Sequence, residues 1–240
     1  MCEVRIGTSG WHYKHWVGPF YPPKWPASKM LAYYFERFDT VEINNSFYRL
    51  PPESAVTGWR EATPPGFCFA VKGSRFLTHM KKLKDPAQGL ERFFSRADLL
   101  GEKLGPVLFQ LPPRWEVNLE RLEAFLRALP PYHGYAFEFR NETWNVPVVY
   151  DLLRRYDAAY CAFDLAGFQS PVVVTANFTY VRLHGPGGKY QGSYSDEALR
   201  LWTERIAVWR RELRAVYVYF DNDQAGYAVE NALRLREMVG

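Results

Sequence analysis

The segment Phe178-Thr179-Tyr180-Val181-Arg182-Leu183-His184 carries the pattern on which the fold prediction rests. Successive side chains of a β-strand point to opposite faces, so the apolar Val181 and Leu183 share one face. Arg182 and His184 share the other face. In a barrel whose strands are covered by helices, the apolar face points outward and the polar side chains point into the barrel. The segment is therefore predicted to be a barrel strand with charged groups inside.

Seven further runs of β-forming residues occur along the chain, at Glu3–Gly7, Thr40–Asn44, Phe67–Lys72, Pro106–Leu111, Tyr135–Arg140, Ala159–Asp164 and Ala215–Phe220. Helical patterns accompany them, at Ser28–Phe38, Glu53–Ala62, Pro86–Lys103, Leu119–Leu129, Val146–Tyr156, Ser195–Leu213 and Ala225–Met238. Leu165–Asn177 is expected to be an extended loop in place of the helix after the sixth strand. Eight strands alternating with helices predict an α/β fold, a single (β/α)8 TIM-type barrel domain over residues 1–240. A doubly wound open sheet is the alternative, but the turn Gly7-Thr8-Ser9-Gly10-Trp11 lacks the GxGxxG pattern typical of that fold.

The composition narrows the class of protein. The chain has 240 residues, 48% of them hydrophobic and 17% aromatic, which excludes a disordered chain. Its length and its three cysteines exclude a small disulfide scaffold. The net charge of +4 permits an anionic ligand, but there is no dense basic run of the kind found in DNA-binding tails. The predominance of Arg over Lys, with few Asn and Gln, suggests a thermophilic or GC-rich source.

No stretch approaches the roughly 20 apolar residues of a membrane span, and the first residues lack an apolar signal region. We therefore expect a cytoplasmic protein with no membrane association.

Strand alternation turns many polar side chains into the barrel or onto its upper rim: Arg5, Glu42, Asn44, Lys72, Gln110, Glu138, Arg140, Asp164, Arg182, His184 and Asp221. Ordinary barrel interiors are filled by Val, Ile and Leu, and a buried charge is costly unless it is paired. A pair of Arg5 with Glu42, low in the barrel, is expected to be structural. The groups near the C-terminal ends of the strands are expected to be functional, because barrel enzymes place their catalytic residues there.

Several long motifs in fixed order resemble the YecE-like family: Gly7-Thr8-Ser9-Gly10-Trp11 with Tyr13 and Trp16, Glu42-Ile43-Asn44-Asn45-Ser46-Phe47-Tyr48-Arg49, Phe109-Gln110-Leu111-Pro112-Pro113, Glu138-Phe139-Arg140, Tyr180-Val181-Arg182-Leu183-His184-Gly185 and Tyr219-Phe220-Asp221-Asn222-Asp223. The resemblance covers essentially the whole chain. It implies a TIM-type barrel, similar in broad shape to apurinic endonucleases and xylose isomerases. It implies no particular activity, because the family is a domain of unknown function.

Our main hypothesis is an enzyme that binds an anionic, phosphorylated or nucleotide-like substrate at the C-terminal face. Arginine binds phosphate and carboxylate oxygens in a bidentate manner, and a buried carboxyl group can transfer a proton. Hydrolysis is favoured over isomerisation because no nucleotide-cofactor motif is present. The candidate catalytic residues are Glu138, Asp164, His184 and Asp221. The candidate substrate-binding residues are Lys72, Arg140 and Arg182 for the anion, Asn44, Asn45 and Gln110 for orientation, and Trp11, Tyr48 and Trp144 for the pocket wall.

One alternative is a divalent-metal isomerase or endonuclease-like barrel, in which Glu138, Asp164, His184 and Asp221 hold Mg²⁺, Mn²⁺ or Zn²⁺. The neighbouring Arg140 and Arg182 would repel such an ion, and no HExxH motif is present. We therefore assign no metal ligands.

Another alternative is glycoside hydrolysis by paired carboxylates, such as Glu138 with Asp164 or Asp221. It requires one carboxyl group with a raised pKa, whereas a lumen crowded with cations lowers carboxyl pKa values.

A further alternative is a nucleic-acid-binding or repair-associated module without catalysis. The first loop interleaves aromatic and basic residues between Trp11 and Trp25, and Arg75, Lys81, Lys82 and Lys84 extend a basic surface. Bases stack on aromatic rings, and Lys or Arg contacts phosphates. A loop rich in glycine, Gly185–Gly192, follows the seventh strand and is a candidate lid or phosphate-binding turn.

Overall fold

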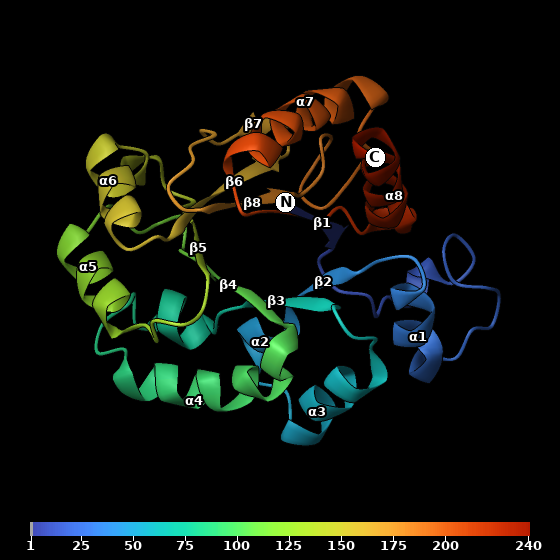
Figure 1. The fold of residues 1–240 in the computed structure, drawn as a ribbon, viewed down its shortest axis with the longest axis horizontal. Coiled ribbons are helices and arrows are strands. Elements are labelled where there is room, and N and C mark those ends of the chain that lie inside the picture. The colour runs from blue at the N-terminus through green and yellow to red at the C-terminus, as the bar shows by residue number, and fades with distance from the viewer. Residues whose placement is uncertain (1) are drawn as a thin grey trace.

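The computed structural model describes residues 2–240, and its strands form a barrel (Figure 1). The strands are β1 (Glu3–Thr8), β2 (Thr40–Ile43), β3 (Cys68–Lys72), β4 (Leu104–Gln110), β5 (Tyr135–Glu138), β6 (Ala159–Leu165), β7 (Phe168–Gln169), β8 (Phe178–Leu183) and β9 (Ala215–Phe220). Their order in the sheet is β1-β9-β8-β6-β5-β4-β3-β2, and every neighbouring pair in this order is parallel. The short β7 pairs antiparallel with β6.

The barrel closes between β1 and β2. Ser9 and Glu42 form an isolated parallel bridge, and the backbone N–H of Gly10 donates to the carbonyl of Glu42 at 2.8 Å. A Cβ atom on Gly7 would lie 2.4 Å from the carbonyl oxygen of Thr40, so only glycine permits this approach of the two strands. Eight parallel strands thus surround a nearly closed barrel, which confirms the predicted (β/α)8 architecture.

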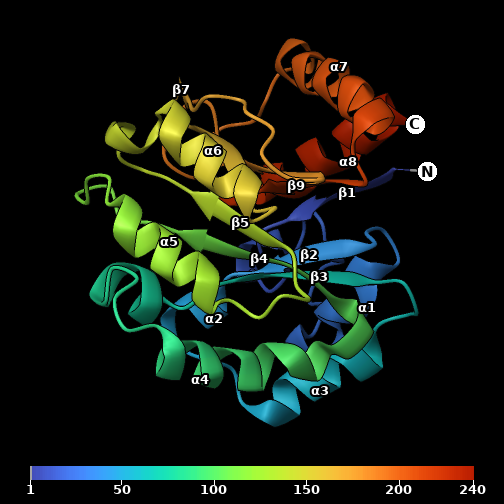
Figure 2. The ribbon, with the colours of Figure 1, turned by 60° about the vertical axis from the view of Figure 1, so that its left-hand side comes forward.

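Helices surround the barrel on its outside (Figure 2). They are α1 (Met30–Phe35), α2 (Asn45–Tyr48), α3 (Glu53–Ala62), α4 (Ala87–Ala97), α5 (Leu119–Ala128), α6 (Pro147–Arg155), α7 (Asp196–Glu212) and α8 (Tyr227–Val239). Two begin with side-chain caps: Asn118 accepts from the N–H of Arg121 at α5, and Ser195 accepts from the N–H of Ala198 at α7. Short 3₁₀ turns lie at Lys14–Trp16, Ala27–Lys29, Asp98–Lys103, Glu142–Trp144 and Gln224–Gly226.

Several boundaries differ from the sequence prediction. The segment expected as one helix at Pro86–Lys103 is α4 followed by a 3₁₀ turn, because Gly101 has a left-handed φ of 57° there. A π-helical turn, Phe76–Met80, follows β3 and was not expected. The loop expected at Leu165–Asn177 contains no helix, and the short β7 lies within it.

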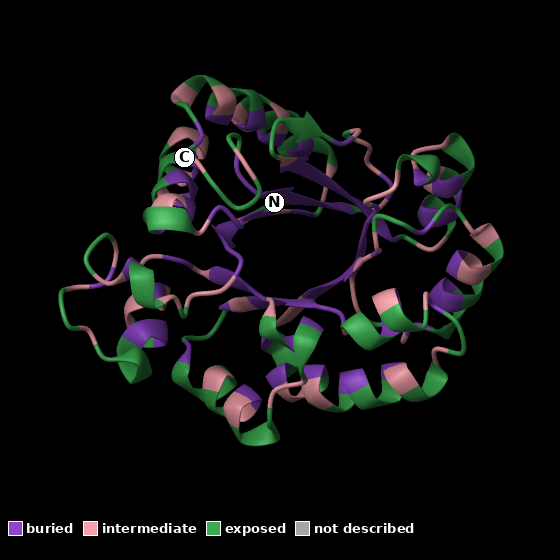
Figure 3. Ribbon diagram, turned by 180° about the vertical axis from the view of Figure 1, so that it is seen from behind, coloured by how far each residue is buried: buried purple, intermediate pink, exposed green. Residues whose placement is uncertain are grey.

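Two separate hydrophobic clusters stabilise the barrel. The larger one lies between strands and helices and contains the outward-facing Phe69, Phe109, Phe137 and Phe220. The smaller one lies among the inward-facing side chains, namely Ala70, Leu108, Ala136, Ala159, Cys161, Phe178, Tyr180, Ala215 and Tyr219. Figure 3 shows the strands buried and the helices exposed on their outer sides. The upper part of the lumen is therefore left for polar groups.

The predicted pair of Arg5 with Glu42 is wrong. Arg5 donates to Asp39 and Glu3, each at 2.9 Å, at the N-terminal end of the barrel. The bridge that pairs Ser9 with Glu42 places Glu42 four residues beyond Arg5 along β1, or about 13 Å higher.

Within residues 2–240 no helix is both long enough and apolar enough to cross a membrane.

Candidate functional site

Arg182 occupies the centre of the upper lumen and contacts three buried carboxylates. Its Nε and Nη2 donate to the two oxygens of Glu42 at 3.0 and 2.8 Å. Its Nη1 donates to Oε2 of Glu138 at 2.9 Å, and its Nη2 donates to Oδ2 of Asp221 at 3.0 Å. With its side chain fully buried, the guanidinium has no room left for a substrate anion. Arg182 is therefore a structural cation and not part of an anion clamp.

The cations around these carboxylates hold them ionised. Burial by itself raises the pKa of Glu138, but the adjacent Arg140 and Arg182 outweigh this effect and hold the pKa well below its ordinary value. Burial likewise acts to raise the pKa of Asp221, and Arg182 lowers it overall. A carboxylate held in this state cannot supply a proton near neutral pH. The environments of Glu138 and Asp221 therefore favour the ionised form, which suits the stabilisation of neighbouring positive charge.

His184 joins the two arginines to Asp221. Its Nε2 lies 2.7 Å from Nη2 of Arg140 and 3.3 Å from Nη1 of Arg182. Because guanidinium groups only donate, Nε2 must accept, which places the ring proton on Nδ1. Nδ1 lies 3.0 Å from Oδ2 of Asp221, although it has no hydrogen-bond partner of good geometry in the described part of the chain. His184 thus accepts from Arg140, which also pairs with Glu138, and helps to hold that guanidinium in place.

Lys72 differs from every other cation in the lumen. It is the last residue of β3, and its side chain is only 8% exposed. Its Nζ lies 4.5 Å from the centre of the Phe47 ring, and within residues 2–240 it makes no hydrogen bond or ion pair. Burial, followed by the charge of Arg182, lowers its pKa to about 8. Lys72 is therefore close enough to Glu42, Glu138 and Asp221 to feel their charge, but its amine is not in direct contact with any of them.

Asp164 is the candidate acid that the cations do not engage. It lies near the end of β6, where its Oδ2 accepts from Nε2 of Gln169 at 3.2 Å. Its Oδ1 is buried and has no hydrogen-bond partner in the described part of the chain. Burial raises the pKa of Asp164 above its ordinary value. The environment of Asp164 favours a protonated carboxyl group, whereas that of Glu138 favours an ionised one. Of these two candidates for proton transfer, Asp164 is therefore the better suited to donate a proton.

The three amides assigned to orientation occupy different places. The Oδ1 of Asn44 lies 3.5 Å from Nη2 of Arg182, at the edge of the charged cluster. Asn45 is exposed at the start of α2. The Nε2 of Gln110 donates to the carbonyl of the adjacent Leu111 at 3.3 Å. Only Asn44 is thus shown beside Arg182.

The predicted aromatic wall is not formed as expected. Trp144 is fully buried, with its ring 4.9 Å from that of Phe139 and its Nε1 donating to the carbonyl of Trp115 at 2.7 Å. It is a packing residue, and its predicted contact with substrate is wrong. Tyr48 is 78% exposed, and its ring lies edge-on to that of Phe47 at 4.9 Å. Trp11 packs edge-on against Trp59 beside Asn44.

Tyr190 lies beside the charged cluster, although no role in the site was predicted for it from the sequence. It lies in the Gly185–Gly192 loop, and its ring centre is 5.7 Å from that of His184. Its backbone N–H donates to the carbonyl of His184 at 2.8 Å, which folds the loop back over the strand end. Burial, with Asp221 adding to it, raises its pKa to about 12, so the hydroxyl stays protonated. The glycine content of the loop was the sequence signal for a lid.

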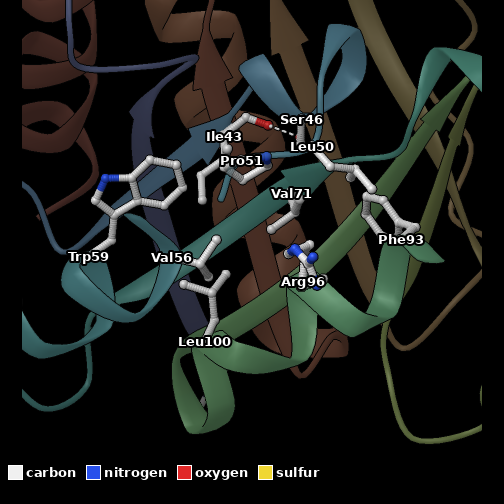
Figure 4. A pocket seen from close by; sticks show the side chains of 11 residues that line it. Ile43, Ser46, Leu50, Pro51, Val56, Trp59, Val71, Phe93, Arg96 and Leu100 are labelled. Atoms are coloured by element: carbon white, nitrogen blue, oxygen red, sulfur yellow. Dashed lines mark hydrogen bonds between the residues drawn. The ribbon is translucent and has the colours of Figure 1, made fainter. Parts of the chain in front are cut away.

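Cavities open at several places on the C-terminal side. One of about 600 Å³ lies beside the first loop, and its lining includes Trp11, Tyr13, Asn44, Asn45 and Trp59. Another of about 400 Å³ lies at the Gly185–Gly192 loop, lined by His15, Lys189, Tyr190, Gln191, Asp223, Gln224 and Ala225. The apolar pocket in Figure 4, between Trp59, Val71 and Phe93, holds only about 10 Å³ and is a packing gap the size of one water.

The four residues considered as metal ligands do not form a ligand set. Among residues 2–240 no group of three or more His, Cys, Asp or Glu side chains is arranged to hold a metal ion. Glu138 and Asp221 are instead bonded to arginine, and His184 faces Arg140 with the nitrogen that a metal would need. The geometry therefore gives no support to the metal alternative.

Comparisons with known proteins agree on the family. Residues 5–240 match the model of a family described as "Protein of unknown function DUF72". The chain is 29% identical to the UPF0759 protein YunF of Bacillus subtilis (strain 168), over 98% of this chain and 94% of that protein. It superposes on the crystal structure of a DUF72 family protein from Thermotoga maritima MSB8 with a TM-score of 0.90 and 29% identity, covering 99% of both chains.

A DUF72 family protein from Enterococcus faecalis V583 shares the fold, with a TM-score of 0.81 at 19% identity over 98% of this chain and 95% of that one. The sequence motifs resembled the YecE-like family, a domain of unknown function. The matches identify a family of unknown function under the description DUF72, and they do not confirm the YecE name. The chain therefore belongs to the DUF72 family, a family of proteins of unknown function.

Proposed function

We propose that this protein is an enzyme that binds an anionic, phosphorylated or nucleotide-like substrate at the C-terminal face of its barrel. The observation that carries the proposal is Lys72, a largely buried residue whose amine makes no hydrogen bond or ion pair within residues 2–240. Partial burial of an ammonium group without a direct partner is unfavourable, and such groups are found preferentially at functional sites. A phosphate oxygen has both the charge and the hydrogen-bonding capacity to act as that partner.

The remaining charges define what the substrate meets. The two arginines, Arg140 and Arg182, face three carboxylates, Glu42, Glu138 and Asp221, so the charge of Lys72 brings the cluster to neutrality. Because the amine of Lys72 makes no direct ion pair within residues 2–240, a bound anion does not have to break one to reach it. The proposed anion site consequently uses Lys72 alone, and not the three cations Lys72, Arg140 and Arg182 that the sequence suggested.

Asp164 is the group that we assign to proton transfer. Its raised pKa and its unpartnered oxygen suit a carboxyl that protonates a leaving group. Glycoside hydrolysis with Glu138 or Asp221 as the acid has less support, because the pKa values of these two groups are lowered. His184 and Asp221 would act indirectly, by holding Arg140 in place.

The proposal also includes a cytoplasmic location. Cys2, Cys68 and Cys161 are all free thiols, which fits a reducing compartment.

Phosphate binding tests the proposal. Isothermal titration of inorganic phosphate into the protein at pH 7 should show saturable binding, which Lys72→Met abolishes. Lys29→Met is the matched control, because it removes the same charge from an exposed position. Affinity should fall as the pH rises above about 8, where the amine of Lys72 loses its proton. Equal binding by wild type and Lys72→Met would refute the assignment of Lys72.

A separate measurement tests the reaction. Phosphomonoesters and phosphodiesters with a chromogenic leaving group should be hydrolysed slowly by the wild type and not by Asp164→Asn, while phosphate binding is retained. Hydrolysis that survives in Asp164→Asn would remove Asp164 from the mechanism.

A further inference from the structure

The segment between β3 and α4 has an unusual backbone for a surface connection. It begins directly after Lys72 and forms the π-helical turn Phe76–Met80. Three non-glycine residues then take left-handed conformations within four positions, Lys82 at φ 47°, Leu83 at φ 63° and Asp85 at φ 46°. Left-handed conformations are strained for residues other than glycine, and π-turns and strained residues concentrate at functional sites.

Two buried leucines anchor the same segment to the hydrophobic core. Leu77 and Leu83 are each 1% exposed and belong to the core between barrel and helices. The strained backbone thus presents the intervening side chains outward on a fixed support.

Those outward side chains are mostly basic. Arg75, Lys81 and Lys84 are exposed and Lys82 is partly exposed, and none of the four forms an ion pair within residues 2–240. The acid in this stretch, Asp85, also takes part in no ion pair within the described chain. Unpaired cations this close together repel one another, so a polyanion that covers them is stabilised.

Apolar side chains lie exposed among these cations. Phe76 is 43% exposed and Met80 is 69% exposed, on the same π-helical turn. Tyr48, 78% exposed, comes from α2. Phe47 connects the two elements, because its ring centre lies 4.9 Å from that of Tyr48 and 5.0 Å from that of His79.

This surface adjoins the anion site. The Phe47 ring that joins Tyr48 to the π-helical turn is also the ring over which Nζ of Lys72 lies, at 4.5 Å. Burial lowers the pKa of His79 to about 4, and the charges of Lys72 and Arg75 add to the effect. The charges of Lys72 and Arg75 therefore both reach the imidazole of His79, which is neutral near pH 7.

We propose that this surface binds single-stranded nucleic acid and leads one of its phosphates to Lys72. We call it the β3–α4 surface; it consists of Tyr48, Arg75, Phe76, Met80, Lys81, Lys82 and Lys84. Amines spaced along a segment contact successive phosphates, and exposed aromatic rings stack on bases, which are free only in single strands. The inference rests on the proposed function and narrows its substrate class to a polynucleotide.

Fluorescence anisotropy with a labelled ten-nucleotide oligothymidylate tests the inference. We expect the oligonucleotide to bind at least tenfold more tightly than thymidine monophosphate, with an affinity that falls as salt rises. The variant Arg75→Gln/Lys81→Gln/Lys82→Gln should lose at least about tenfold in affinity, and its logarithmic salt slope should be shallower by about 2. Tyr48→Ala should lose about tenfold through lost stacking, and a duplex of the same length should bind more weakly than the single strand.

The matched control removes three exposed cations elsewhere, in Arg92→Gln/Arg211→Gln/Arg214→Gln. It should keep the oligonucleotide affinity of the wild type within about twofold. Both triple variants change exposed side chains only or nearly so, and their thermal unfolding should match that of the wild type.

The outcomes separate this inference from the proposed function. Equal affinity for oligonucleotide and monophosphate, or an unchanged affinity in the β3–α4 triple variant, would overturn the β3–α4 surface and leave the Lys72 site standing. Oligonucleotide binding that needs the β3–α4 surface but is unaltered in Lys72→Met would support the surface as a binding site and overturn the step that leads a phosphate to Lys72. Binding to vesicles of phosphatidylserine and phosphatidylcholine, lost in the triple variant and without any oligonucleotide binding, would overturn the inference in favour of a membrane surface.

Discussion

Replacing Arg182 with methionine removes the guanidinium around which the upper lumen is built. Glu42 would lose its cation and keep only the hydroxyls of Ser9 and Tyr180, at 2.5 and 2.6 Å. Asp221 would keep only the imidazole of His184 at 3.0 Å, while Glu138 would keep Arg140. Breaking one buried ion pair costs about 3–5 kcal/mol, and here two carboxylates are left without a cation.

We therefore expect Arg182→Met to lower the free energy of unfolding at pH 7 by about 5 kcal/mol, a large part of the total for a typical domain. Urea unfolding followed by tryptophan fluorescence and circular dichroism measures this loss. Arg234→Met is the matched control, because Arg234 also contacts two carboxylates, Asp196 and Glu237, but at the exposed surface. It should change the free energy of unfolding far less.

The loss should also depend on pH in a defined direction. Asp221 and Glu138 have folded-state pKa values below 3.8 and 4.5, so their contribution to stability is present above those values and is lost as the pH falls through the folded-state pKa. Without Arg182 these groups protonate at higher pH, which relieves the unpaired charge. The difference between wild type and Arg182→Met should therefore shrink between pH 7 and about pH 4. A difference below about 1 kcal/mol at pH 7, or one that does not change with pH, would refute the reasoning.

Other predictions follow from single positions. Asp164→Asn should unfold at a higher temperature than the wild type at pH 7, because burial raises the pKa of Asp164 and so penalises its ionised form; the gap should close at about pH 3.5, and a gap that persists there would contradict this. Gly7→Ala should lower the free energy of unfolding in urea by about 2 kcal/mol or more, because its Cβ atom would meet the carbonyl oxygen of Thr40. Gly58→Ala in α3 has open space and should raise it by up to about 1 kcal/mol. Equal effects of the two variants would argue against the tight β1–β2 closure. Lys72→Met should be at least as stable as the wild type at pH 7, with the difference narrowing from about pH 8 to 10.5 as the unfolded amine deprotonates; a clear loss of stability would show that Lys72 has a partner.

The period of two along each strand was sufficient to place the charged groups. Glu138, Arg182 and His184 lie inside the barrel because Phe137, Val181 and Leu183 need the apolar space under the helices. What alternation cannot give is height along the barrel axis. Arg5 and Glu42 share the lumen but lie at different levels, so Arg182 and not Arg5 became the partner of Glu42.

Loop residues carried no comparable signal. Trp144 and Tyr48 both follow strands, yet Trp144 is buried against the ring of Phe139, whereas Tyr48 is exposed at the surface. The left-handed residues after the π-helical turn are Lys82, Leu83 and Asp85, and of these residue types only Asp is enriched at positive φ. The residue types therefore did not predict this run of left-handed conformations. Identifying Lys72 as the unpaired cation likewise required coordinates, because it depends on which carboxylates the arginines have already engaged.

The ionisation of Lys72 tests the central claim most directly. Its pKa can be followed by NMR on protein labelled with ¹³C at lysine Cε, with the signal assigned by its absence in Lys72→Met. We expect a pKa of about 8 in the free protein and an increase toward the ordinary value of 10.5 when inorganic phosphate is added. A pKa of 10.5 in the free protein, or one that phosphate leaves unchanged, would contradict the account of Lys72 as a buried cation that awaits an anion.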